Sequence, residues 1–148
     1  MTANENNLRT LDELRDEMTR RLNSNLKAQR DAQRQLDDAH LCLNSTRQNH
    51  LNLSAEVKRR SEQMADFAHY LARLTDNGTQ FHKAKLGGMH TEVAELKQYR
   101  DTVEANIKLN EITVKEVSEK ISALLEECKV LEENEKRILE EIEDLSKA

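Results

Sequence analysis

The sequence predicts an all-α protein made of long coiled-coil helices, and three observations indicate this fold class. The composition is 34% charged and only 3% aromatic, with no proline and three glycines, which is typical of long solvated helices. Apolar residues recur every seven residues through most of the chain. This repeat changes phase once, beside all three glycines. We therefore expect helices over about residues 3–75 and 89–147, separated by a Gly-containing break.

The first predicted helix carries an unbroken heptad repeat, whose positions are lettered a to g. Position a falls on every seventh residue over 8–71, and position d does so over 11–74. A seven-residue period held over this length predicts left-handed supercoiling. The helix is expected to start within residues 3–10, because capping boxes mark helix N-termini. Two pairs have the capping-box spacing, namely Thr2 with Glu5 and Thr10 with Glu13.

The second predicted helix has the more apolar seam. Position a runs over residues 86–142 and position d over residues 89–145, with β-branched residues frequent at a. The two ladders differ in phase by one residue, and the slip falls in the segment 76–88. Asn-Gly is a turn dipeptide, and each glycine inside a helix costs about 1 kcal/mol relative to alanine. The expected organisation is an N-terminal helix over 1–75, a hinge or turn over 76–88, and an acidic C-terminal helix over 89–148. The expected hinge residues are Asn77, Gly78, Gly87 and Gly88.

Two architectures fit these ladders. In a rod, one bent helix pairs with a partner along its length, whereas in a helical hairpin the two arms fold back on each other. A hairpin centred near residue 82 would place Arg60 opposite the region of Glu104 and Ala32 opposite the region of Leu131. The heptad pattern resembles that of long rod proteins such as myosin tails, kinetochore and ciliary coiled coils, and vesicle tethers. This resemblance is architectural, and no residue role follows from it.

Charge and hydropathy argue against binding to nucleic acid and against insertion into a membrane. The net charge is −5; residues 1–76 hold 12 basic and 12 acidic side chains, and residues 77–148 hold 11 and 16. Phosphate binding requires a basic excess, so nucleic acid is not expected as a partner. No apolar run approaches the roughly 20 residues that span a bilayer, so membrane insertion is not expected. A polar N-terminus and two cysteines predict an intracellular, cytoplasmic or cytoskeletal location.

Catalytic, cofactor and metal sites are not expected. No two of the five histidines stand three or four residues apart, which is the spacing for metal ligands on one helix face. The one compact basic cluster, residues 58–60, could contact an acidic partner or lie on a solvated face. Polar residues at the core positions could instead fix register and partner choice. These residues are Arg15, Asn25, Gln29, Thr46, His50, Arg60, Arg100, Asn110 and Glu135.

The second helix is expected to bind partners, which would themselves be coiled-coil helices. Leucines at position e widen its apolar stripe beyond a two-stranded seam. A homodimer would place the glutamates that border this stripe together, so a hetero-oligomer is expected. These glutamates are Glu126, Glu127, Glu132, Glu133, Glu140, Glu141 and Glu143. The expected function is a non-enzymatic scaffold or adaptor subunit of a cytoskeletal assembly (microtubule, kinetochore or ciliary), or alternatively a membrane-trafficking tether. The expected partner-binding residues are Val114, Ile121, Leu124, Leu125, Leu131, Ile138, Leu139, Ile142 and Leu145.

Overall fold

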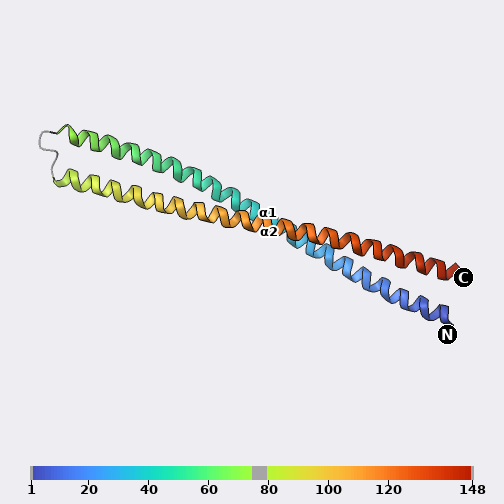
Figure 1. Ribbon diagram of the computed structural model, residues 1–148. Helices are drawn as coiled ribbons and strands as arrows, with labels where there is room; N and C mark the ends of the chain where they lie inside the picture. The colour runs from blue at the N-terminus through green and yellow to red at the C-terminus, as the bar shows by residue number, and fades with distance from the viewer. Residues whose placement is uncertain (1, 75–79, 148) are drawn as a thin grey trace. The chain divides into compact units, whose positions relative to one another are not determined.

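The computed structural model describes residues 2–74 and 80–147 and consists of two long helices (Figure 1). Helix α1 spans Ala3–Ala72 and helix α2 spans Gln80–Lys147. Within these described ranges there is no strand. The predicted all-α class is confirmed, and the arrangement is the helical hairpin rather than the extended rod.

A capping box starts α1, as the sequence predicts. The backbone N–H of Glu5 donates to Thr2 Oγ1 (3.2 Å), and the N–H of Thr2 donates to Glu5 Oε2 (3.3 Å). These two bonds satisfy donors that the first helical turn leaves without intrahelical partners. Thr10, the other candidate cap, lies inside the helix and donates its hydroxyl to the carbonyl oxygen of Asn6 (3.0 Å).

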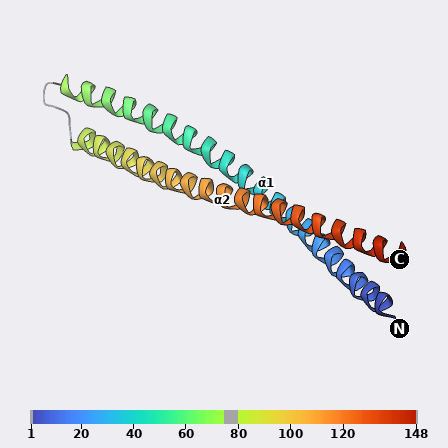
Figure 2. The same cartoon turned by 45° about the vertical axis from the view of Figure 1, so that its right-hand side comes forward.

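The chain is divided into two units, each of which contains a part of α1 and a part of α2 (Figures 1 and 2). Unit 1 consists of residues 2–38 and 114–147, and unit 2 consists of residues 39–74 and 80–113. In each unit the α2 part runs antiparallel to the α1 part and packs against it. No helix among the described residues is long and apolar enough to cross a membrane.

Heptad positions a and d form the seam of both units. Every described residue at these positions, over 8–74 in α1 and 86–145 in α2, is buried or half-buried, and most other residues are exposed. Side chains such as Leu43, Val57, Val93 and Leu131 retain 4–6% of their surface. The heptad ladders therefore predicted the seam residue by residue.

The register differs from a hairpin centred near residue 82. Arg60 binds Glu92 rather than a residue near Glu104, with Nη1 2.6 Å from Glu92 Oε2. Together with the heptad phases, this contact sets each residue at heptad position a of one helix level with a residue at position d of the other helix. The one-residue slip between the ladders does not interrupt the seam, because antiparallel arms need not share one phase.

Aromatic residues hold the arms together near the end of α1. The ring of Phe67 lies 6.1 Å from that of Tyr70 and 6.3 Å from that of His82, measured between centroids. The ammonium of Lys85 lies 4.9 Å from the centre of the Phe67 ring, within cation–π range. These contacts from α2 reach back to α1 and help to fix the register of unit 2.

The break between the helices is shorter than residues 76–88, which corrects the predicted hinge. Gly87 and Gly88 lie inside α2, which begins at Gln80. The carbonyl of Gly87 accepts a hydrogen bond from the hydroxyl of Thr91 (3.1 Å). Asn77 and Gly78 lie outside the described residues. Leu86 and Met89 beside the two helical glycines are half-buried seam residues, and their packing offsets the low helix propensity of glycine.

Alanine in place of the helical glycines should stabilise the protein. A Cβ atom added at Gly87 or Gly88 would meet nothing within 4 Å. We expect Gly87→Ala and Gly88→Ala each to raise the free energy of unfolding by roughly 0.5–1 kcal/mol, because alanine restricts the unfolded chain without strain. Urea unfolding followed by circular dichroism measures this change. A loss of stability in both variants would show that the glycines form a bend rather than regular helix.

Candidate functional site: a helix-binding face

Asn25 is the one buried polar side chain among the described residues, and it bridges the two helices of unit 1. It keeps 3% of its surface, and its Nδ2 donates to the backbone carbonyl of Leu124 (2.9 Å). Gln29 Nε2 donates to Asn25 Oδ1 (2.5 Å). A buried amide without an acceptor would cost stability, so the bond to the Leu124 carbonyl helps to hold the two helices of unit 1 together.

A second polar layer joins the helices of unit 2. Asn110 Nδ2 lies 3.3 Å from Thr46 Oγ1 and 3.6 Å from Cys42 Sγ. Beside it, Arg47 Nη2 lies 3.1 Å from Glu111 Oε1, and both side chains are about half exposed. An exposed ion pair of this kind contributes about 0–1 kcal/mol to the free energy of unfolding, so its main effect is to align the two helices.

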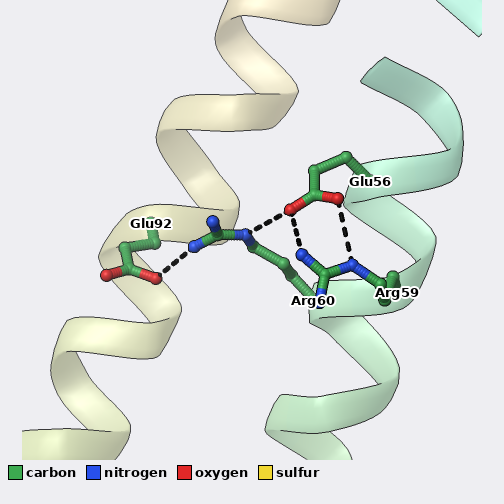
Figure 3. A network of polar contacts seen from close by, with 4 residues as sticks. All are labelled: Glu56, Arg59, Arg60 and Glu92. Atoms are coloured by element: carbon green, nitrogen blue, oxygen red, sulfur yellow. Dashed lines mark hydrogen bonds and ion pairs between the residues drawn. The ribbon is translucent and has the colours of Figure 1, made fainter. Parts of the chain in front are cut away.

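The predicted basic cluster is largely paired within the protein. Figure 3 shows the carboxylate of Glu56 between the guanidinium groups of Arg59 and Arg60, and Arg60 reaching across to Glu92 on α2. Hydrogen bonds from Arg59 and then Arg60 lower the pKa of Glu56 to about 2. Because the two arginines already bind carboxylates, the cluster offers less positive charge to an acidic partner than the sequence indicates.

Most of the predicted partner-binding residues form the seam of unit 1. Only Leu125 and Leu139, at position e, are exposed, with 48% and 43% of their surface accessible. The other seven lie at a or d and pack in the hairpin, where they are buried or half-buried. These seven are Val114, Ile121, Leu124, Leu131, Ile138, Ile142 and Leu145.

Leu125 lines a groove to which α1 also contributes. The groove has a volume of about 500 Å³ and lies between the two helices of unit 1. Its walls are formed by Leu26, Gln29, Arg30, Gln33, Ile121 and Leu125. Leu26 is 46% exposed and, like Leu125, occupies position e. Sequence reasoning missed Leu26, because the e positions of the two arms become neighbours only when the arms are antiparallel.

The described residues contain no cluster of three or more His, Cys, Asp or Glu side chains that could hold a metal ion. Cys42 is exposed and Cys128 is buried, and neither is in a disulfide. Burial and a contact with the Glu132 carboxylate, 3.5 Å from Sγ, raise the pKa of the Cys128 thiol. A raised pKa disfavours the reactive thiolate, so Cys128 serves as a seam residue.

Comparison with protein-family models, curated proteins and solved structures finds no match. Function must therefore be argued from the helix faces themselves. The strongest feature is the side of unit 1 that carries the groove and the exposed e leucines, hereafter the e face.

Removal of the Asn25 amide should destabilise the hairpin. We expect Asn25→Ala to lower the free energy of unfolding by about 1–3 kcal/mol, because the bond to the Leu124 carbonyl is lost and the half-buried Gln29 amide loses its partner. Asn44→Ala, at an exposed position on the same helix, is the matched control and should change stability by less than about 0.5 kcal/mol. Equal effects in urea titrations of the two variants would show that the Asn25 layer does not stabilise the seam.

The Glu56 network should stabilise the protein only while the carboxylate is ionised. The pKa of Glu56 is depressed from 4.5 to about 2 in the folded protein, so this contribution is complete above pH 4.5 and is lost as the pH falls towards 2. Glu56→Gln should therefore lower the thermal unfolding midpoint at pH 7 and have little effect near pH 2. Glu62→Gln, an exposed carboxylate of the same helix, controls for loss of one charge. An identical pH response of the two variants would contradict the assignment.

Proposed function

We propose that the protein is a non-enzymatic structural or adaptor subunit that works by binding other coiled-coil helices. The observation that carries this proposal is the e face of unit 1. There, Leu26 and Leu125 remain about half exposed on either side of a groove between the helices. A groove with apolar walls between two parallel ridges fits the apolar edge of a further helix.

The energetic incentive comes from the thinness of a two-helix core. Among the described residues no large side chain is fully buried, and most seam residues are only half-buried. Fully burying a leucine contributes about 1.5–3 kcal/mol relative to leaving it in water. Covering Leu26, Leu125 and Leu139 would add to stability without opening the hairpin.

For the assembly to which the protein belongs, we propose a general class and not a particular complex. A subunit of a cytoskeletal assembly inside the cell fits the long coiled-coil helices. The hetero-oligomer expected from the sequence stays a prediction. It rests on the glutamates beside the apolar stripe of α2, which a homodimer would bring together, and the hairpin bears only on the parallel meeting of Glu127 with Glu132. Association between copies of this chain is the alternative to it.

The e face is tested by making it polar. The variant Leu125→Glu with Leu139→Glu should remain helical and lose its helical partners in pull-downs from native extract, because two charged side chains would enter an apolar contact. Leu41→Glu with Leu109→Glu is the matched control, since these leucines are 69% and 61% exposed at other heptad positions. Retention of all partners by the folded e-face variant would refute the proposal.

A further inference from the structure

The e face of unit 1 is bordered on each helix by a row of exposed residues at heptad position b. In α1 this b row consists of Arg9, Asp16, Asn23, Arg30 and Asp37. In α2 it consists of Lys115, Ser122, Lys129, Lys136 and Glu143. On a helix, b and e lie on the same side of the seam, so these rows are the rim of any surface that covers the groove.

The register of the hairpin fixes which members of the two rows stand at the same level. Asn25 contacts the carbonyl of Leu124, and Leu26 and Leu125 line one groove. Successive turns then place these b residues level with each other: Arg9 with Glu143, Asp16 with Lys136, Asn23 with Lys129, Arg30 with Ser122, and Asp37 with Lys115.

We propose that two copies of this chain associate through their e faces, about a two-fold axis parallel to the helices, to form a four-helix bundle in unit 1. A rotation about this axis shifts no residue along the helices, and it places α1 of one copy over α2 of the other. The register of the hairpin therefore also determines which residues of the two copies face each other.

Charge complementarity supports this occupant. Three of the five b-row levels join opposite charges, and the other two join a charged residue to Asn23 or Ser122. No level joins like charges. At the e positions Leu26 of one copy lies over Leu125 of the other, which covers the groove with apolar surface, whereas the same register sets Leu139 over Asp12. Each of these pairs occurs twice in a symmetric dimer.

The opposite face of unit 1 is less suited to a second copy. It is bordered by position c, where the same register sets Asp38 level with Glu116. It also lacks a leucine pair that faces across the helices, because Ala28 and Glu127 line its groove. At position c the same register joins Glu17 with Arg137 but also two acidic residues, whereas no b level joins like charges, so the charge pattern favours the e face.

This inference rests on the proposed function and names the partner helices as those of a second copy. The two can fail separately. A protein that remains monomeric but captures another helical protein through Leu125 and Leu139 would overturn self-association and leave the adaptor proposal standing.

A charge swap tests the pairing in solution. Sedimentation equilibrium of the full chain should show a monomer–dimer equilibrium that weakens with added salt. Lys136→Glu should raise the dimer dissociation constant about tenfold, because two attractive contacts become repulsive. Adding Asp16→Lys to the same chain should restore it to within about threefold. Lys120→Glu, on the opposite face, is the matched control and should have little effect.

Cross-linking tests the geometry independently of affinity. In a background of Cys42→Ser and Cys128→Ala, a mixture of the Asp16→Cys and Lys136→Cys variants should form a disulfide between chains. A mixture of Lys27→Cys and Glu126→Cys, which stand at one level on outward-facing f positions, should not. A protein that is still monomeric at about 100 µM, or one that dimerises with neither the charge-swap response nor the specific cross-link, would overturn the proposal.

Discussion

The antiparallel seam is the constraint on which the rest of the structure depends. Once position a of one helix stands level with d of the other, the polar layers, the ion pairs and the exposed rows all take fixed places. Asn25 reaches Leu124, and Arg60 reaches Glu92, in the same register. A shift by one residue would turn apolar seam positions towards solvent, and a shift by a full heptad would separate Arg60 from Glu92 and Asn110 from Thr46.

The sequence predicted the seam well, because a heptad repeat is a local property that needs no knowledge of the partner. Every described residue predicted at a or d is buried or half-buried, and the Thr2–Glu5 cap begins α1. The boundary at Gln80 could not be predicted, because glycine in a helix costs only about 1 kcal/mol, and packing of neighbours such as Leu86 can offset that cost.

The groove could not be predicted for a different reason. Whether Leu26 faces Leu125 depends on chain direction and on a register that differs from a centre near residue 82 by several turns. In a parallel pairing Leu26 would instead stand near Arg21 of its partner and would not form a shared groove. Prediction of the e face therefore requires the topology of the hairpin, whereas the core residues can be predicted from the sequence alone.

In the hairpin the acidic residues of α2 take definite places relative to the seam and to the e face. Four of the fourteen glutamates of α2, Glu119, Glu126, Glu133 and Glu140, form a row at position f on the side away from the seam. The corresponding row of α1 carries Arg20, Lys27 and Arg34. These rows keep the outer surfaces of both helices solvated. Among the described glutamates of α2 in unit 1, only Glu132 at e and Glu143 at b lie on the e face, where exposed leucines and basic residues accompany them. That face is therefore the side of unit 1 that best accommodates a further helix.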